Sequence, residues 1–427
     1  MLAPFRGIRY ARDRVSGIAN VTSPPYDVIN DGFLDHLRAA DPHNVVRLIL
    51  PGEDAEASQA AGRLLGDWLS AGVLIRDRMP ALYLYEQSDT ASSWLQRGII
   101  GLVRLGSPES AGILPHENVM PGPVAGRREL MEATRSNLEP IFLVYDGEEA
   151  GDSSAQTATG ILDQVAAERA PLLTIITEDG VTHRLWRLSD PEEQAVIVTD
   201  LASRRALIAD GHHRYAAYLQ MQAEMRASDL GAGPWDYGLA FLVDSAAYPP
   251  RLGAIHRVLP GLAPERAAEL AKAAFTVQEL PGGTSLVEAQ QLLAVAGREG
   301  NAFLLAGGPG FNLLTHPDPV QLAASMPARA SVYWRRLDAS VLQQLLLGQL
   351  WGVADSEHDV LIDHDAANAV RTVSEGAGGT AVISNPVSFA DVIEIAANSE
   401  RVPRKSTSFG PKPRTGLVLR RFGPCNS

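Results

Sequence analysis

The chain has 427 residues, of which 45% are hydrophobic and 20% are charged. This composition is typical of a globular protein and excludes a disordered or fibrous chain, and the length predicts one elaborated domain or two to three subdomains. The formal net charge of −13, from 50 acidic and 37 basic residues, argues against general binding of nucleic acid.

Cysteine content and hydropathy bear on the compartment in which the protein works. Because Cys425 is the single cysteine, the chain can form neither an internal disulfide nor a cysteine metal cluster. The N-terminal sequence MLAPFRGIRY lacks the apolar core of a signal peptide, and no run of about 18 apolar residues predicts a transmembrane helix. We therefore expect a soluble cytoplasmic protein without a membrane partner.

Short apolar runs alternate with longer amphipathic stretches over the first 250 residues. Runs rich in Val, Ile, Leu and Tyr predict strands at 44–50, 81–85, 98–103, 141–144, 183–188, 206–209 and 235–243. Helical spacing predicts helices at 33–40, 55–71, 127–135, 154–168 and 212–225. This interleaving predicts an α/β or α+β fold with a mixed sheet.

The pattern of predicted helices and strands changes after about residue 250. Ala- and Leu-rich helices are expected at 262–274 and 286–296, and short strands at 302–305 and 311–314. Near the end, residues 401–421 carry seven basic residues and no acidic one. We expect an N-terminal α/β region at 1–250 and a C-terminal α+β region at 251–427 that ends in a basic strand.

The stretch ALIADGHHRYAAYL, residues 206–219, places ionisable groups between a predicted strand and a predicted helix. Backbone N–H groups and the helix dipole at such a turn favour an anion, and Arg214 could add a bidentate contact. His212 and His213 could donate protons or bind an anion. Asp210 could hold a metal ion, accept a proton or orient a histidine. The alternative is a structural turn, with Asp210 as the helix N-cap and Gly211 as the tight bend.

The strand–D-G-H-H-R–helix segment resembles the phosphate-binding motif of the ParB/sulfiredoxin-like superfamily, whose members carry a G-x-x-R turn between a strand and a helix. That superfamily includes chromosome-partitioning nucleotide hydrolases, sulfiredoxins and free-serine kinases with a similar D-G-H-x-R turn. The resemblance implies a nucleotide or phosphoryl group at Gly211, His212, His213 and Arg214.

A second resemblance extends along the whole chain. The sequence resembles the bacterial and archaeal family known as domain of unknown function 1015, which implies no particular reaction. The segments that carry this resemblance are PFRGIRY (4–10), SPPYDVI (23–29), HNVVRLIL (43–50), LPHE (114–117), ATRSNLEPIF (133–142), DGVTHRLWRL (179–188), ADGHHRY (209–215), LDASVL (337–342) and PRKSTSFGPKPRTGLV (403–418).

The segment 114–142 contains another group of candidate residues. His116 and Glu117 follow a predicted strand, and Pro121 to Pro123 are expected to break the chain before a helix that carries Arg127 and Arg135. A histidine and a glutamate on a loop facing arginines suit a general base with a phosphate clamp. The alternative is a surface loop next to a solvated helix face.

Two further segments could face a ligand. In TSPPYDVI, two prolines fix the backbone and present Tyr26 and Asp27 at a defined place, either toward a substrate or as a chain-entry turn. In the basic C-terminal segment, Lys405, Ser406 and Thr407 could bind phosphates together with Lys412. The alternative for that segment is a solvated basic strand.

These patterns together predict an enzyme that handles phosphate, with a small phosphorylated ligand as its partner. The leading hypothesis is a nucleotide-dependent kinase of a small hydroxyl metabolite, with ATP or ADP and Mg²⁺ as cofactors. Gly211 to Arg214 would cradle the phosphates, and the nearby arginines and Lys405 would neutralise their charge. Glu117 or Asp210 would accept the hydroxyl proton. Likeness to the serine kinases implies free serine or a similar hydroxy-amino acid as the substrate.

Two alternatives remain open from the sequence. One is a nucleotide-sensing regulatory protein without efficient catalysis. The other is a metabolite phosphatase or phosphodiesterase that forms a phosphohistidine at His212 or His213. Neither the metal ligands nor the oligomeric state is predicted.

Overall fold

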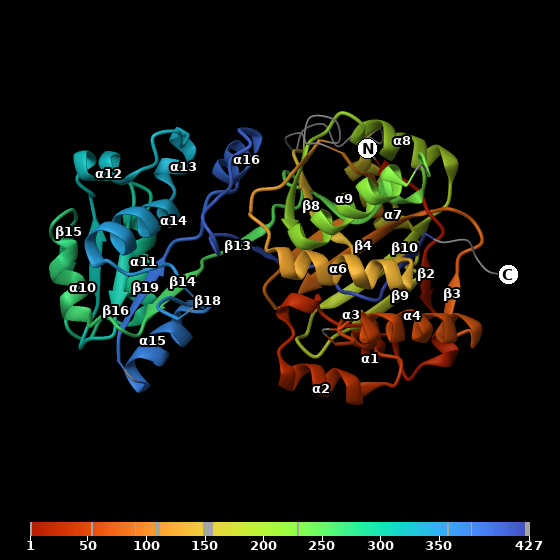
Figure 1. Cartoon of the computed structure of the whole chain (residues 1–427), viewed down its shortest axis with the longest axis horizontal. Helices are drawn as coiled ribbons and strands as arrows, with labels where there is room; N and C mark the ends of the chain where they lie inside the picture. The colour runs from red at the N-terminus through yellow and green to blue at the C-terminus, as the bar shows by residue number, and fades with distance from the viewer. Residues whose placement is uncertain are drawn as a thin grey trace. The chain divides into compact units, whose positions relative to one another are not determined.

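The computed structural model of the chain describes residues 2–52, 54–89, 91–106, 112–147, 157–228, 230–356, 358–376 and 378–422, so that Cys425 lies outside the described residues. The chain divides into two compact units (Figure 1). The first unit comprises Met1–Pro115, Val119–Pro250 and Pro411–Ser427, and the second comprises His116–Asn118 and Arg251–Gly410. In the described ranges, no helix combines the length and the apolarity needed to cross a membrane.

A nine-stranded mixed sheet forms the centre of the first unit, in the order β6-β11-β8-β12-β5-β4-β10-β9 with β1 paired to β5. The pairs β11–β6 and β12–β8 are parallel, and the other pairs are antiparallel. The strands are β1 (Leu2–Ala3), β4 (Leu82–Asp89), β5 (Trp94–Arg104), β6 (Ile113–Leu114), β8 (Ile141–Tyr145), β9 (Leu173–Ile176), β10 (Thr182–Leu188), β11 (Ala206–Asp210) and β12 (Tyr237–Asp244). Two small ribbons, β2 (Ile8–Tyr10) with β3 (Leu74–Arg76) and β7 (Ser136–Asn137) with β21 (Arg420–Arg421), complete this unit. The predicted mixed α/β class is confirmed.

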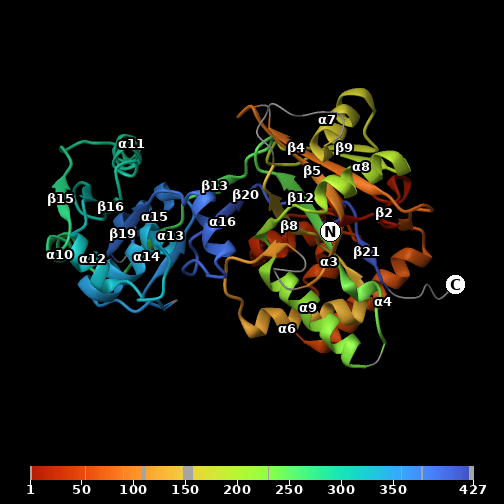
Figure 2. The same ribbon diagram turned by 90° about the horizontal axis from the view of Figure 1, so that it is seen from above.

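Alternation of side chains gives the sheet two buried faces. On one face, Leu84, Ile99 and Leu143 belong to an apolar cluster with residues of helices α6 to α9. On the other face, the ring centroids of Tyr85 and Phe241 lie 5.2 Å apart. The helices of the unit are α1 (Ile18–Val21), α2 (Asp31–Ala40), α3 (Val46–Ile49), α4 (Ala55–Ser70), α6 (Pro121–Thr134), α7 (Ala158–Glu168), α8 (Pro191–Leu201) and α9 (His212–Ala227). Helices α6 and α9 lie side by side, as Figures 1 and 2 show.

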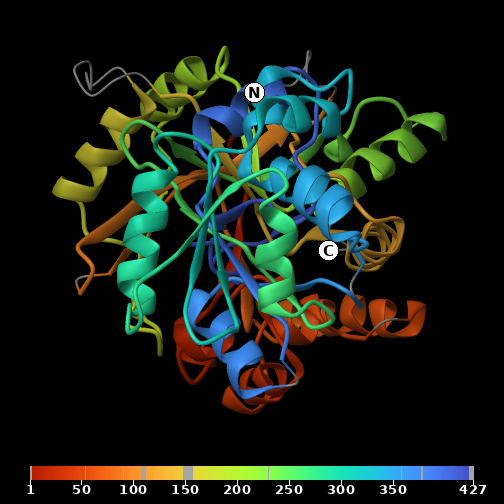
Figure 3. The ribbon, with the colours of Figure 1, turned by 90° about the vertical axis from the view of Figure 1, so that its left-hand side faces the viewer.

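The second unit contains a six-stranded sheet in the order β15-β17-β16-β19-β14-β18. Phe303 and Leu305 pack in one apolar cluster and Leu304 in another, so both faces of this sheet are buried. In Figure 3 helices drawn in green and teal lie on both sides of its strands. The elements are β13 (Arg251–Gly253), β14 (His256–Leu259), α10 (Pro264–Ala271), β15 (Thr276–Glu279), α11 (Leu286–Ala296), β16 (Phe303–Ala306), β17 (Asn312–Thr315), α12 (Pro319–Ser325), α13 (Val332–Arg336), α14 (Asp338–Val341), the π-helix Leu342–Trp351, β18 (Leu361–Asp363), α15 (Ala366–Glu375), β19 (Thr380–Ser384), α16 (Phe389–Ala397) and β20 (Ser408–Gly410).

Two local predictions from the sequence are wrong. The apolar run 44–50 forms the short helix α3 rather than a strand, because the side chain of Asn44 accepts a hydrogen bond from the N–H of Val46 at 3.0 Å and starts a helical turn. Pro121 to Pro123 do not break the chain before α6 but form its first turn. Proline is tolerated there because N–H groups in the first turn have no partner within the helix.

The C-terminal residues 411–422 return to the first unit. Thr415 and Leu419 make isolated bridges with Ser23 and Ile8, and Arg420 pairs with Asn137 in the β7–β21 ribbon. This return brings Lys412 and Arg414 into the first unit from the far end of the chain.

Gly98 in β5 tests the close packing of the central sheet. A Cβ atom at this position would lie 2.3 Å from the carbonyl oxygen of Leu242 and 2.7 Å from the ring of Phe241. We expect Gly98→Ala to lower the free energy of unfolding by about 1–3 kcal/mol, because overpacking forces the neighbours to shift. Gly66 in α4 has no atom within 4 Å of such a Cβ, so the control Gly66→Ala should stabilise the protein by about 0.5–1 kcal/mol. Urea unfolding followed by circular dichroism measures both changes, and equal effects of the two substitutions would contradict this packing.

Candidate active site

The strand-to-helix turn lies in the first unit, where β11 ends at Asp210 and α9 begins at His212. Gly211 between them has φ 98° and ψ 28°, a left-handed conformation that favours glycine. A Cβ atom there would also lie 3.0 Å from Ile141 and 3.2 Å from Nε of Arg214. Both the backbone conformation and the close approach of Arg214 therefore require glycine at this position.

Arg214 is buried beside this turn. Its Nη1 donates to the carbonyl oxygen of Pro140 at 2.7 Å, and its Nη2 forms an ion pair with Oδ2 of Asp210. Among the described residues, its Nε has no hydrogen-bond acceptor. The guanidinium is thus fixed at the start of α9, with one buried donor unused.

Asp210 has a second cationic partner from the end of the chain. Nζ of Lys412 lies 2.6 Å from Oδ1 of Asp210 and also pairs with the carboxylate of Asp27. The ammonium group therefore lies between two carboxylates, and both oxygens of Asp210 are engaged.

The groups in this cluster shift one another's pKa. Burial alone would raise the pKa of Asp210, but Arg214 and Lys412 outweigh it and hold that pKa below its ordinary value. Burial alone would lower the pKa of Lys412, but Asp210 and Asp27 raise it. The pKa of Arg214 is raised against its burial by Glu139, Asp210 and Asp27. All three groups of the central cluster are therefore charged at neutral pH.

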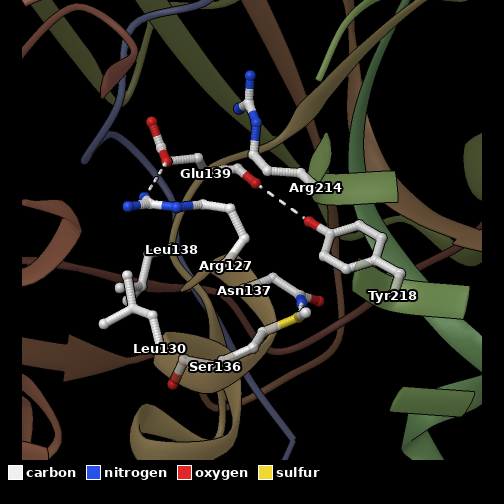
Figure 4. Close-up of a pocket in the computed structure, with 9 residues that line it drawn as sticks. Arg127, Leu130, Ser136, Asn137, Leu138, Glu139, Arg214 and Tyr218 are labelled. Carbon is white, nitrogen blue, oxygen red and sulfur yellow. Dashed lines mark hydrogen bonds and ion pairs between the residues drawn. The ribbon is translucent and has the colours of Figure 1, made fainter. Parts of the chain in front are cut away.

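The aromatic ring of Tyr26 connects this cluster to Arg127 of α6. Cζ of Arg127 lies 4.2 Å from the ring centroid and Cζ of Arg214 lies 5.7 Å from it. Buried Glu139 accepts a hydrogen bond from the N–H of Tyr26 at 3.1 Å and lies 3.9 Å from Nη1 of Arg127. Figure 4 shows Arg127 and Glu139 pointing toward each other, while the guanidinium of Arg214 points away from Tyr218.

Two cavities adjoin at Arg127 and Leu130, which line both. The smaller cavity, of about 30 Å³, is also lined by Arg214 and Glu139 and has room for about one water molecule. The larger cavity has a volume of about 610 Å³, within the usual range for small-molecule sites. Polar and small residues among its lining include Tyr26, Asp31, Arg38, Gly122, Arg127 and Glu129.

The start of helix α6 contributes to the larger cavity through Gly122 and Pro123. The first turn of α6 has no hydrogen bond from a capping side chain. Because Pro121 and Pro123 have no N–H group, the N–H of Gly122 is the donor that this part of the turn can offer to a ligand. A helix N-terminus with two arginines, Arg38 and Arg127, favours an anionic group. The larger cavity can therefore accept a phosphate-bearing ligand.

The histidines of the turn face other partners. Nε2 of His213 accepts a hydrogen bond from the N–H of Met120 at 3.2 Å, which joins the turn to the start of α6. His212 is buried in the first turn of α9. Neither histidine lines the two cavities. Arg135, at the C-cap of α6, is exposed, and it does not line either cavity.

The other predicted site residues belong to the second unit. His116 is buried, and its Nε2 lies 2.9 Å from Oγ1 of Thr407, which donates to Oε1 of Glu117 at 2.6 Å. Buried Ser406 donates to the carbonyl oxygen of Pro403 at 2.6 Å. The carbonyl oxygen of exposed Lys405 accepts a hydrogen bond from Arg257. His116, Glu117 and Thr407 thus form one hydrogen-bonded group within the second unit.

Sequence reasoning did not pair Asp210 with Lys412, and it did not identify Glu139 or Arg38. The basic segment and the rigid turn around Tyr26 and Asp27 were visible as candidates, but nothing in the local pattern indicates that they meet. A glutamate before a proline in the segment 133–142 is the only signal for Glu139. These residues are brought together by pairings that are distant in sequence.

The predicted Mg²⁺ would need acidic side chains of the site as ligands. In the part of the chain that the structure describes, no group of three or more His, Cys, Asp or Glu side chains is arranged to hold a metal ion. Asp27 and Asp210 are the two carboxylates at the turn, and Lys412 already lies between them. The present arrangement of these side chains therefore does not fit a bound Mg²⁺.

The Asp210 cluster should make stability depend on pH. A carboxyl group whose pKa is lower in the folded state stabilises the fold above its unfolded pKa, here 3.8, and this contribution is lost as the pH falls through the folded value. We expect Asp210→Asn to lower the free energy of unfolding by about 3 kcal/mol at neutral pH, because it leaves buried cations uncompensated. The difference from wild type should narrow below about pH 4. Urea unfolding of both proteins between neutral pH and below about pH 4 measures this difference in the free energy of unfolding. A difference that does not change with pH would argue against an ionised Asp210.

Comparisons with known proteins place the chain in a family. A family model described as Protein of unknown function (DUF1015) matches residues 2–340. Similar solved structures include a free serine kinase variant in complex with ADP, with 15% identity, a TM-score of 0.34, and coverage of 70% of this chain and 84% of that chain. They also include SbnI with a C-terminal truncation from Staphylococcus aureus (11%, TM-score 0.32, 75% and 81%) and a conserved hypothetical protein from Pyrococcus furiosus (14%, TM-score 0.33, 73% and 92%). None of the curated proteins matches the chain. The protein belongs to the family of proteins of unknown function DUF1015.

Proposed function

We propose that this protein is a phosphate-handling enzyme that transfers a phosphoryl group from a nucleotide to a small hydroxyl metabolite. The observation that carries the proposal is the grouping of three cations, Arg127, Arg214 and Lys412, with ionised Asp210, in which Arg127 also lines the cavity of about 610 Å³. Phosphoryl transfer depends mainly on positioning and on charge stabilisation, so it needs no other kind of side chain.

The larger cavity is the proposed nucleotide site, for ATP or ADP. Its volume suits a ligand of this size. Arg38, Arg127 and the amide of Gly122 supply contacts to phosphate oxygens, and the ring of Tyr26 supplies an apolar surface between the cavity and Arg214. The phosphate chain would extend past Arg127 toward Arg214.

The proposed transfer uses Asp210 as the general base. An entering phosphate competes with Asp210 for Arg214 and Lys412, which now pair with it. Asp210 then accepts the proton of the substrate hydroxyl, whose oxygen forms the new bond to the terminal phosphorus. The bond from that phosphorus to the bridging oxygen breaks, and the shortened nucleotide leaves. Free serine or a similar hydroxy-amino acid stays the predicted substrate.

A second candidate function is a nucleotide-sensing protein without efficient catalysis. It is favoured by one observation, namely that both carboxylate oxygens of Asp210 are engaged by cations. The two functions differ in turnover, since a sensor binds nucleotide whether or not a hydroxyl substrate is added. An enzyme consumes nucleotide only when that substrate is present.

Arg127 and its neighbour Arg128 provide a matched test of the nucleotide site. Arg127 lines the larger cavity, whereas Arg128 pairs with Glu132 and Glu224 and lines neither cavity. We expect Arg127→Gln to weaken binding of ATP or ADP by about tenfold to a hundredfold, the usual effect of losing a charge-assisted hydrogen bond. Arg128→Gln should bind as wild type does. Isothermal titration calorimetry measures both, and equal affinities of the two variants would place the nucleotide elsewhere.

Asp210→Asn tests the proposed base. We expect the variant to bind nucleotide at least as tightly as wild type does, because Asp210 no longer competes with the phosphate for Arg214 and Lys412. We expect it to lose about a hundredfold to ten-thousandfold in kcat, the usual contribution of a positioned general base. The measurement is nucleotide consumption with and without a panel of hydroxyl metabolites that includes serine. Full turnover in the variant would exclude Asp210 as the base. Nucleotide binding without turnover in wild type across the panel would favour the sensor.

A further inference from the structure

A second large cavity in the first unit lies against another face of helix α2. It has a volume of about 570 Å³, and Phe33 and His36 of α2 line it, whereas Asp31 and Arg38 line the nucleotide cavity proposed above. Residues at this spacing project from different faces of a helix. The second cavity is therefore a separate site, and its lining does not include Arg127 or Asp210.

The positive group of this cavity is Arg414, which comes from the C-terminal segment. Its Nε donates to Oγ1 of Thr22 at 2.7 Å, and its Nη2 donates to the carbonyl oxygens of Thr22 and Ala19 at 2.9 and 3.1 Å. Among the described residues, Nη1 has no acceptor within hydrogen-bond distance. The guanidinium is thus held in place with one edge available to a ligand.

The negative groups of the cavity are Asp179 and Glu178. Oδ1 of Asp179 accepts hydrogen bonds from Oγ1 of Thr177 at 2.5 Å and from the N–H of Val181 at 3.3 Å. These bonds outweigh burial and hold the pKa of Asp179 below its ordinary value. In the described part of the chain, no ion pair within 4 Å joins Arg414 to either acid. Opposite charges therefore share one cavity without neutralising each other directly.

A buried chain of hydrogen bonds fixes both charges. The N–H of Arg414 donates to the hydroxyl of Tyr85 at 3.2 Å, and this hydroxyl lies 2.8 Å from Nδ1 of His183. Nε2 of His183 lies 3.1 Å from the hydroxyl of Thr177, which donates to Asp179. Burial and Arg414 lower the pKa of His183 to about 3, so its ring is neutral with one N–H. That N–H belongs on Nε2, because Tyr85 can then donate to Nδ1 and every donor in the chain has an acceptor.

We propose that this cavity binds a small zwitterion of the amino-acid type, with its carboxylate on Arg414 and its ammonium group on Asp179 and Glu178. Charges that are held apart by other hydrogen bonds need little rearrangement when a ligand bridges them, and such preorganisation lowers the cost of binding. A ligand with only one charge would leave one of the two poles uncompensated. The stacked rings of Phe33 and His36, with centroids 6.1 Å apart, offer an aromatic surface for the remainder of the ligand.

Calorimetric titration of the full chain tests the charge requirement of this site. The probes are the standard amino acids, β-alanine and γ-aminobutyrate as zwitterions, with butyrate and butylamine as compounds of a single charge. We expect at least one zwitterion to bind with a Kd in the millimolar range or below, and the single-charge compounds to bind at least about tenfold more weakly. The proposal is overturned if none of the zwitterions binds, or if butyrate binds as tightly as the best zwitterion.

Substitutions then locate the binding site. Asp179→Asn removes the negative partner, and Arg414→Lys keeps the positive charge but removes the planar guanidinium. Each should weaken binding of the best zwitterion by about tenfold or more. Glu178 is highly exposed, so Glu178→Gln provides a variant with little risk to folding. Asp35→Asn, an exposed position on α2 that lines neither cavity, is the matched control and should bind as wild type does. Unchanged binding in Asp179→Asn and Glu178→Gln, or an equal loss in Asp35→Asn, would exclude this cavity. Nucleotide binding by the same variants reports separately on the proposed active site.

Discussion

The ion pairs of Asp210 with Arg214 and Lys412 constrain how the first unit can be built. A buried charge that lacks a partner costs several kcal/mol, roughly the stability of a typical domain. Asp210 and Arg214 are one helical turn apart and pair within a single element, but Lys412 comes from the other end of the chain. Within the first unit, Asp210 therefore lacks its second cationic partner until the C-terminal segment, which follows the second unit in the sequence, has joined the first unit.

The returning segment supplies more than one buried cation. Arg414 is held by Thr22 and Ala19, and Arg420 donates to Oδ1 of Asn137 at 2.8 Å and is almost fully buried. Burial lowers the pKa of Arg420 to about 10, so it keeps its charge at neutral pH. A basic run of this kind is easily interpreted as a solvated strand, yet its side chains contact the interior of the first unit. Its positive charges match carboxylates and carbonyl oxygens that the first unit leaves without partners.

Local patterns predicted most of the sheet and most of the long helices, because alternation and helical spacing report directly on which side chains are buried. They also predicted the bend at Gly211 between a strand and a helix. The prediction failed at 44–50, which forms a helix instead of a strand. In a run that is buried on all sides, the hydrophobic periodicity does not distinguish a strand from a helix. Local patterns could not predict that Lys412 meets Asp27 and Asp210, since local periodicity carries no information about contacts across hundreds of residues. The sequence also grouped Lys405 with the turn, and the structure assigns Lys405 to the second unit.

The balance of charge in the site has a consequence for the proposed reaction. Arg127, Arg214 and Lys412 lie beside three acidic side chains, Asp27, Glu139 and Asp210, so basic and acidic side chains are equal in number in this cluster. A phosphate group that enters must take cations away from a carboxylate. Two of these cations pair with Asp210, and in the proposed mechanism it can accept a proton only after a phosphate has replaced it. In the proposed mechanism, binding of the nucleotide and release of the base are therefore the same electrostatic exchange.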